Sequence, residues 1–279
     1  MKVSGFTFIR NAVKYDFPLL EAIQSALPVV DEFIVNVGNS EDETLALIRS
    51  LDDPKIQIIE SVWDDTLKRD GRVLGLQQDI ALSQCSGDWA FLVQGDEVIH
   101  EDDLAAIREA MNQYAADERV LGLVFRVIHF KGDYWSVDPW MYRKATRVIR
   151  TNQGISSSAD GCDFRTKQSS RMIKSGESGR IIPARVFHYG WVKHAEIFRE
   201  KKREMEGWWH GETRSVQELD EAARLQAAFP NYAILKDYAG THPRVMRERI
   251  DKSRRLRPRR NRWLNWEFYR EVVKHGFKG

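Results

Sequence analysis

Short apolar runs alternate with amphipathic stretches along the first part of the chain. Four runs have the length and composition of buried strands: residues 3–9, 32–37, 56–59 and 89–93. Between them, apolar side chains recur at helical spacing, which predicts helices over residues 17–27, 44–51 and 73–84. This order predicts an α/β, Rossmann-like fold, with a mainly parallel sheet and helices on both faces. In such sheets, ligands bind beyond the carboxyl ends of the strands.

The pattern changes after a predicted helix over residues 101–115. Longer apolar segments predict further strands over residues 120–130, 140–150 and 181–187. Residues 151–179 are rich in Ser, Gly, Asn and Asp and predict a long loop or lid. Charged amphipathic helices are predicted over residues 195–209 and 244–255. Because neither a repeat nor a strong linker divides the chain, we expect one domain over residues 1–243 and a helical extension over 244–279.

The formal net charge of +2 hides an uneven distribution. Residues 244–279 contain 13 Lys and Arg against 4 Asp and Glu, a charge of +9, so that residues 1–243 carry −7. A basic extension of this kind suits anionic lipid head groups, nucleic acid or a phosphate-bearing acceptor. The alternative is that it forms ion pairs with the acidic body of the same chain.

Composition and cysteine usage indicate the class of protein and its compartment. An apolar content of 42% with 30% charged residues is typical of a globular protein. No apolar run approaches the roughly 18 residues of a membrane span, and the start lacks the pattern of a signal peptide, so we expect a cytoplasmic protein. Cys85 and Cys162 are far apart, which predicts reduced thiols and neither a disulfide framework nor a cysteine metal site.

Polar clusters follow each of the first four predicted strands, and the cluster at residues 94–97 is the most informative. There, a buried strand leads directly into Gln94, Gly95, Asp96 and Glu97. Carboxylates at the edge of a parallel sheet are oxygen ligands for a hard cation, so Asp96 and Glu97 predict a site for Mg²⁺ or Mn²⁺. The alternative is that these acids lie in a solvated turn and cap the next helix.

These residues resemble glycosyltransferase family 2, whose members have the GT-A fold. The segment from Gln78 and Asp79 through Gly87, Asp88 and Trp89 resembles the family's lead-in of a helix, a glycine, an acid and an aromatic residue. Residues 94–97 then fall where the family has its acidic DxD motif, and the similarity covers about residues 3–104. The resemblance implies a nucleotide-sugar-binding half over 1–104 and an acceptor-side half over 105–243.

The resemblance also implies which residues hold the donor. The expected nucleotide-sugar-binding residues are Arg10, Asn11, Asn39, Ser40, Asp79, Gln94 and Asp96. Two positions depart from the family's pattern. Gln94 replaces the first acid of the DxD motif, which removes one charge from the expected metal site. The loop after the second strand carries Asn39 and Ser40 instead of acids, so the base of the nucleotide stays open.

Two further groups are expected on the acceptor side. His188 resembles the late histidine that completes the metal shell in many GT-A enzymes, and a structural histidine is the alternative. Asp160 and Asp163 are the candidates for the base that takes the acceptor's proton, although either suits a turn beside glycine. Aromatic side chains that suit a sugar platform, or else the core, are Trp135, Trp140, Tyr142, Trp208 and Trp209.

The resemblance therefore implies an inverting, metal-assisted glycosyltransferase of polysaccharide biosynthesis that uses a nucleoside-diphosphate sugar. A glycan or lipid-linked acceptor is expected, with peripheral contact between the basic extension and the inner face of the membrane. Nucleic acid is the alternative partner of that extension. A nucleotidyltransferase is the alternative enzyme, but such enzymes have a Gly-rich loop after the first strand, where this chain has Arg10, Asn11, Ala12 and Val13.

Overall fold

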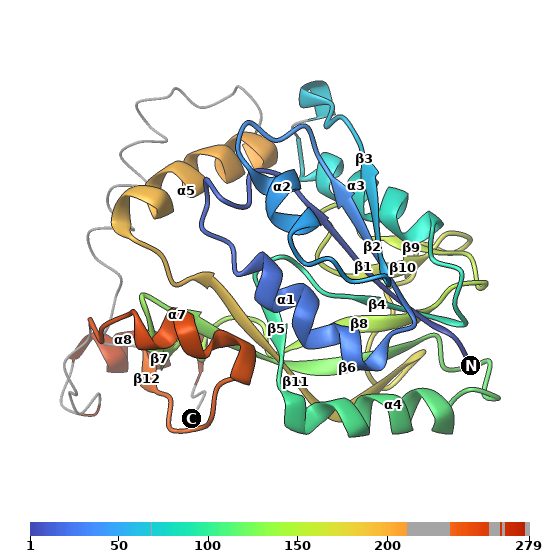
Figure 1. Cartoon of the computed structure of the whole chain (residues 1–279). Helices are drawn as coiled ribbons and strands as arrows, with labels where there is room; N and C mark the ends of the chain where they lie inside the picture. Colours follow the sequence, from blue (N-terminus) through green and yellow to red (C-terminus); the bar gives the residue numbers. More distant parts are fainter. Residues whose placement is uncertain (68, 211–234, 257–262, 264–265, 277–279) are drawn as a thin grey trace.

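The computed structural model describes the chain except for residues 68, 211–234, 257–262, 264–265 and 277–279 (Figure 1). Its first half confirms the predicted α/β alternation. The strands are β1 (Val3–Ile9), β2 (Glu32–Val37), β3 (Ile56–Glu60) and β4 (Trp89–Leu92). The helices between them are α1 (Leu19–Ala26), α2 (Thr44–Arg49) and α3 (Arg72–Ser83). The strands pair in the order β3-β2-β1-β4, all parallel, so their carboxyl ends meet at one edge.

The second half extends the same sheet with strands of both directions. β8 (Lys144–Arg150) pairs antiparallel with β4, and β6 (Gly122–Lys131) pairs antiparallel with β8. β11 (Gly179–Trp191) runs parallel to β6 and antiparallel to β5 (Glu97–Ile99). Beyond β6 the sheet ends with β7 (Asp133–Val137) and β12 (Lys236–Asp237). The sheet is thus mixed, and its parallel part is the half that the sequence pattern predicts.

Helices cover both faces of the sheet, as predicted. Because successive residues of a strand point to opposite faces, Val3 and Ile9 of β1 belong to one core cluster and Phe6 to another. The first cluster includes residues of α1, α2 and α4 (Leu104–Gln113). The second includes Ala81 of α3 and residues of the segment 151–179.

The segment 151–179 is more ordered than the expected loop. It contains a small antiparallel hairpin of β9 (Ile155–Ser157) and β10 (Phe164–Thr166). Phe164 is fully buried against Phe6 of β1, with the ring centroids 6.3 Å apart. This segment therefore closes the core on the face that α3 covers.

The C-terminal part begins with α5 (Ala195–His210), which lies on the same side of the molecule as α2 in Figure 1. The helix predicted over residues 244–255 is shorter in the structure, as α7 (Arg247–Asp251), and α8 (Trp266–His275) follows. Short 3₁₀ helices are η1 (Leu27–Val29), η2 (Asp65–Leu67), η3 (Glu101–Asp103) and η5 (Arg244–Met246). Arg249 of α7 forms ion pairs with Asp16 and Glu21, both at 2.6 Å. This part of the basic extension is therefore docked on the acidic body, while residues 257–262, 264–265 and 277–279 of it lie outside the described residues.

No helix in the described part of the chain is both long and apolar enough to cross a membrane.

Candidate active site

One pocket opens at the edge where the carboxyl ends of the parallel strands meet. Its walls come from the end of β1, the loop after β4, the end of β11 and the inner side of α5. Of the residues predicted for the site, it brings together Arg10, Gln94, Asp96, Asp160 and His188. The predicted location, beyond the carboxyl ends of the strands, is thus where the structure has its pocket.

Asp96 lies in the charged centre of the pocket and is 9% exposed. Its Oδ2 atom is 3.1 Å from Nζ of Lys201 and 3.7 Å from Nε2 of His188. Burial by itself raises the pKa of Asp96, but the Lys201 ammonium and the other cationic groups hold it well below its usual range. Asp96 is therefore ionised in this pocket.

Lys201 reaches Asp96 from α5 and is itself 8% exposed. Its ammonium donates hydrogen bonds to Asp96 Oδ2 and to the backbone carbonyl oxygen of Gly190, both at 3.1 Å. Lys193 lies nearby and donates to the carbonyl oxygen of Asp16 at 2.8 Å. Burial, together with the charge of Lys201, lowers the pKa of Lys193 to about 7. Lys193 does not itself line the pocket, so the amine that meets the Asp96 carboxylate there is that of Lys201.

His188 contributes no positive charge at neutral pH. Burial lowers its pKa to about 4, and this outweighs the opposite effect of Asp96. Its Nδ1 atom is buried and has no hydrogen-bond partner among the described residues. The ring of His129 lies 4.8 Å from it, centroid to centroid, and burial lowers the pKa of His129 to about 4 as well. The positive charge near Asp96 at neutral pH therefore comes from Lys201 and in part from Lys193.

Glu97 lies behind the pocket and does not line it. Both of its carboxylate oxygens are bound by the guanidinium of Arg147, at 2.7 and 2.6 Å, and both side chains are 1% exposed. A bidentate ion pair of this kind satisfies the charge and the hydrogen-bonding capacity of a buried carboxylate. The structure assigns Glu97 to this ion pair and not to the position of a metal ligand facing the pocket.

The described donors at the pocket do not fit a divalent metal ion. Hard cations take six or more ligands, mainly oxygens. Here the Asp96 carboxylate is bound by Lys201, Glu97 is bound by Arg147, and the Gln94 amide donates to the carbonyl oxygen of Gly161 at 2.9 Å. Within the described part of the chain, no three His, Cys, Asp or Glu side chains are grouped so that they could hold a metal ion.

Arg10 enters the pocket from the end of β1. Its guanidinium lies 3.5 Å from Asp65 and 4.0 Å from Glu41, and only 9% of its side chain is exposed. Its Nε atom is buried, with no hydrogen-bond partner among the residues that the structure describes. A buried donor in this state suits an anionic ligand, because an unmade hydrogen bond is costly.

Four other residues predicted to bind the donor do not line this pocket. Asn11 and Ser40 join the loops after β1 and β2 through a hydrogen bond from Asn11 N to Ser40 Oγ of 3.0 Å. Asn39 accepts a hydrogen bond from the backbone of Trp63 at 3.0 Å. Asp79 of α3 accepts one from Ser157 of β9 at 2.7 Å, and burial raises its pKa. In the structure these four side chains hold loops and strands together around the site.

The two candidate bases are placed differently. Asp160 lines the pocket, and one of its oxygens accepts hydrogen bonds from the Ser158 hydroxyl at 2.5 Å and from the Cys162 backbone at 3.1 Å. Asp163 does not line it. The Asp163 carboxylate accepts from the Phe164 backbone at 3.0 Å, and burial raises its pKa.

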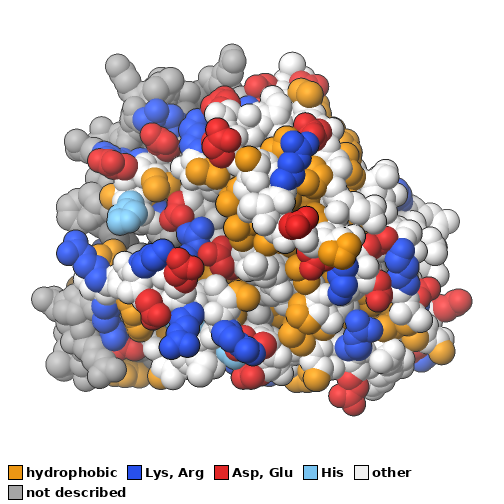
Figure 2. Space-filling model, in the orientation of Figure 1, with side chains coloured by type: hydrophobic (Ala, Val, Ile, Leu, Met, Phe, Trp, Pro, Cys, Tyr) orange, Lys and Arg blue, Asp and Glu red, His pale blue; other side chains and the backbone are white. Residues whose placement is uncertain are grey.

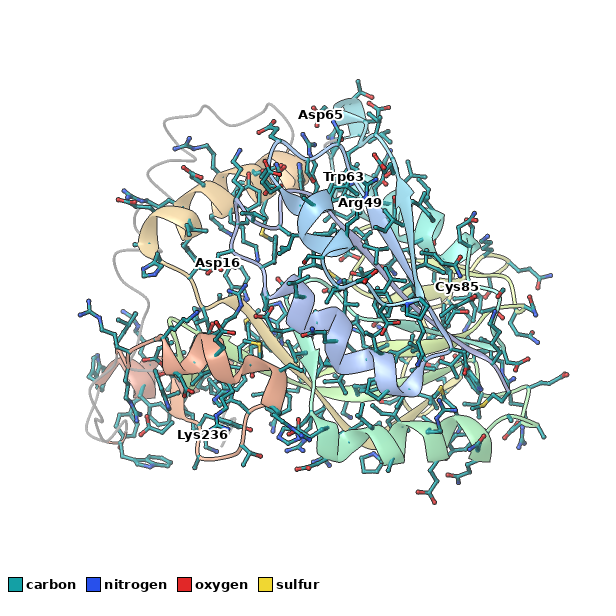
Figure 3. The ribbon with its side chains drawn as sticks, viewed as in Figure 1. Asp16, Arg49, Trp63, Asp65, Cys85 and Lys236 are labelled. Carbon is teal, nitrogen blue, oxygen red and sulfur yellow. The ribbon has the colours of Figure 1, made fainter. Side chains whose placement is uncertain are left out.

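The aromatic wall of the pocket differs from the predicted platform. Tyr142 and Trp208 line it, whereas Trp135 and Trp140 do not, and the side chain of Trp209 lies outside the described residues. The other aromatic residues of the wall are Phe8, Tyr15, Phe17, Trp63 and Trp191. Trp63, which Figure 3 labels, follows β3 and packs against Trp208 with centroids 5.1 Å apart.

On α5, sequence reasoning identified Trp208 as a candidate but missed Lys201, Glu204 and Met205. Lys201, Glu204, Met205 and Trp208 all line the pocket from this helix. Their spacing of three and four residues was a usable signal, because it places them on one face of a helix. The Glu204 carboxylate accepts a hydrogen bond from the Tyr15 hydroxyl, and burial raises its pKa.

Comparison with known proteins finds similarity in solved structures alone. No protein-family model matches the sequence, and no curated protein matches it. The chain is similar to TarS 1-349 of S. aureus, at 16% identity and a TM-score of 0.40, over 83% of this chain and 72% of that chain. The same TarS fragment in complex with UDP-GlcNAc gives 16% identity and a TM-score of 0.39, over 83% and 73%. The longer TarS structure is covered to 44%.

A further similar structure is glucosyl-3-phosphoglycerate synthase from Mycobacterium tuberculosis in complex with Mn²⁺, UDP and phosphoglyceric acid. The identity is 18% and the TM-score 0.32, over 47% of this chain and 44% of that chain.

Proposed function

We propose that this chain is a glycosyltransferase that moves a sugar from a nucleoside-diphosphate sugar to a hydroxyl acceptor, with inversion at the anomeric carbon. The observation that supports it is a single pocket, at the carboxyl ends of the parallel strands, which joins a charged centre to an aromatic wall. The charged centre contains Arg10, Asp96 and Lys201. Cationic groups suit a diphosphate, and aromatic faces suit the base and the sugar ring.

Arg10 is the proposed first contact of the diphosphate. Its guanidinium is held by Asp65 and Glu41 at 3.5 and 4.0 Å, distances that leave its donors weakly used, and its Nε atom has no partner within the described residues. Trp63 and Trp208 offer the proposed surface for the base, because both line the pocket and their rings are in contact with each other.

Asp160 is the proposed general base of the transfer. The acceptor oxygen forms a bond to the anomeric carbon, and its proton passes to the Asp160 carboxylate. At the same time the bond from the anomeric carbon to the diphosphate breaks, and its electron pair stays on the diphosphate oxygen. Attack from the face opposite the leaving group inverts the configuration. We choose Asp160 over Asp163 because Asp160 lines the pocket.

Glycosyl transfer is favoured over nucleotidyl transfer by the turn after β1. Asn11 takes a left-handed conformation there, with a φ of 56°, and its side chain accepts a hydrogen bond from the backbone of Glu41 at 2.8 Å. That turn is held by a side chain and contains no run of glycines that could surround phosphates with backbone donors.

The acceptor, the cytoplasmic location and the contact with an anionic membrane through residues 244–279 stay predictions. Arg244, Arg249 and Arg255 of the extension already form ion pairs with acids of the body, so the membrane contact is proposed for its other basic residues.

A thermal-shift screen with UDP, GDP, ADP and CDP, followed by transfer assays with the matching nucleotide sugars, tests the function. We expect one nucleoside diphosphate to raise the melting temperature, because ligand that binds the folded state stabilises it. Asp96→Asn should abolish hydrolysis and transfer of that nucleotide sugar while the circular dichroism spectrum stays unchanged. Asp102→Asn, at a carboxylate that is 69% exposed, is the matched control and should retain activity. Near-normal turnover of Asp96→Asn, or the lack of any shift with the four nucleotides, would contradict the proposal.

A further inference from the structure

The carboxylate predicted to bind a metal ion already has a cation beside it. Lys201 Nζ is 3.1 Å from Asp96 Oδ2, and its second hydrogen bond goes to the carbonyl oxygen of Gly190. The ammonium also lies over the ring of Phe17, at 4.4 Å from the centroid, and 5.7 Å from that of Trp191. An ammonium has three N–H donors, so one remains for a ligand.

A divalent ion at Asp96 would compete with this ammonium directly. At the same carboxylate, the two cations would repel each other in a buried and weakly screened environment. The neighbouring side chains Glu97 and His188 do not offset this repulsion with negative charge. The Glu97 carboxylate is neutralised by Arg147, and His188 is uncharged at neutral pH. Gln94 supplies an amide where a further carboxylate would be needed.

Two cationic side chains in the wall of the pocket suit a diphosphate. Arg10 and Lys201 both line the pocket, from β1 and from α5. The amine of Lys193 lies 4.8 Å from the centroid of the Phe17 ring, on which Lys201 also packs. A bound diphosphate could therefore be met by positive side chains that approach from separate elements.

We infer that the ammonium of Lys201 takes the place of the divalent metal ion, so that this chain binds the diphosphate of its donor, and releases it, without a metal. The inference rests on the proposed function. In the transfer step, Lys201 remains a cation and donates a hydrogen bond to the diphosphate oxygen that receives the electron pair. It transfers no proton, and Asp96 holds it in position.

Binding of a nucleoside diphosphate in EDTA and in Mn²⁺, measured by calorimetry, tests this role. The probe is the nucleotide that gives the largest thermal shift among UDP, GDP, ADP and CDP. We expect the wild-type dissociation constant to agree within about twofold between the two conditions. Lys201→Met should weaken binding in EDTA about ten- to hundredfold, the range for losing a hydrogen bond to a charged group. Lys201→Arg, which keeps the charge, should restore most of the affinity.

Lys202→Met is the matched control, because Lys202 is the next residue on α5, pairs with Glu206 at 2.9 Å and does not line the pocket. Its dissociation constant should equal that of the wild type. Melting temperatures of all variants show whether each is folded. A second measurement uses Mn²⁺ alone: the paramagnetic resonance signal of free Mn²⁺ should not fall when the wild-type protein is added.

The outcomes separate this inference from the proposed function. Wild-type binding that requires Mn²⁺, unchanged binding by Lys201→Met, or stoichiometric uptake of Mn²⁺ alone would overturn the role of Lys201 and leave the glycosyltransferase proposal standing. If none of the four nucleotides binds in either condition, the proposed function is wrong and the inference is overturned with it.

Discussion

At Gly190, β11 passes so close to Asp96 that no side chain fits between them. A Cβ atom built at Gly190 would lie 2.3 Å from Asp96 Oδ2 and 2.8 Å from His188 Cε1. The carbonyl oxygen of the same residue accepts the second hydrogen bond of Lys201. One glycine therefore lets the carboxylate, the imidazole and the ammonium meet in the pocket.

We expect Gly190→Ala to destabilise the fold by about 1–3 kcal/mol, the usual cost of overpacking, and to weaken nucleoside diphosphate binding at least tenfold. Urea denaturation and calorimetry measure the two effects. Gly207→Ala is the control on α5, because a Cβ atom there meets nothing within 4 Å. Replacing glycine within a helix should stabilise by about 0.5–1 kcal/mol. If Gly190→Ala and Gly207→Ala had the same stability and the same nucleotide affinity, the close approach at Gly190 would be shown to be unimportant.

At the scale of elements, side-chain contacts hold α5 against the loops that form the rest of the pocket. Lys201 joins α5 to Asp96, Glu204 to Tyr15, and Trp208 to Trp63. A backbone hydrogen bond from Gly71 N to the carbonyl oxygen of Trp208, at 3.1 Å, adds to these contacts. A helix held in this way opens more easily than the strands of the core.

We expect hydrogen exchange of the amides of α5 to slow when the nucleoside diphosphate binds, because the ligand adds contacts between the helix and the sheet. Trp208→Ala should speed exchange in the free protein and weaken binding about tenfold, within the range of about 1–3 kcal/mol for a lost stacking contact. Trp266→Ala is the control, since Trp266 is 78% exposed on α8 and does not line the pocket. Exchange in α5 that is the same with and without ligand would refute this role of the helix.

At the scale of the whole molecule, charged side chains lie at the carboxyl ends of the parallel strands, at their amino ends and on the basic extension. In Figure 2, several Lys and Arg side chains, with Asp and Glu side chains among them, lie over the part that holds α7. At the amino ends of the parallel strands, Glu32 is 7% exposed and binds Lys2, Ser4 and Ser86. This carboxylate joins the starts of β1 and β2 to the loop before β4.

Glu32 should make stability depend on pH in the acid range. Burial raises its pKa, but the hydrogen bonds from Lys2, Ser4 and Ser86 outweigh this and lower the value from 4.5 to about 2. Because the pKa is depressed in the folded state, the stabilisation is fully present above pH 4.5 and is lost as the pH falls toward about 2. We expect Glu32→Gln to cost about 2 kcal/mol at pH 7, after a discount for the exposure of Lys2, and almost nothing near pH 2.

Denaturant unfolding of wild type and variant between pH 2 and pH 7 measures this difference. Glu60→Gln is the control, because Glu60 is 63% exposed and its ion pair with Arg49 is at the surface. A loss of stability for Glu32→Gln that is the same at every pH would contradict the ionic role of Glu32.

The local sequence pattern predicted the parallel half of the fold well, because the apolar residues of each element recur with the spacing of a strand or of a helix. β1 and α1 are recognisable without any neighbour, since strand and helix spacing follow from which side chains face the core. β5 and β7 were missed, because Glu97–Ile99 and Asp133–Val137 are short and acquire strand character only by pairing with β11 and β6. The hairpin of β9 and β10 was missed in the same way.

The amino-acid sequence by itself determined that acids follow a buried strand at Asp96, and that this strand belongs to a sheet whose ligands lie at its carboxyl edge. Tertiary structure alone decided what faces those acids. Arg147 and Lys201 are 50 and 105 residues from their carboxylate partners, so no local pattern pairs one with Glu97 and the other with Asp96. The physical reason is that a buried charge takes its state from whichever groups surround it in space, and the packing of β8 and α5 sets those groups here.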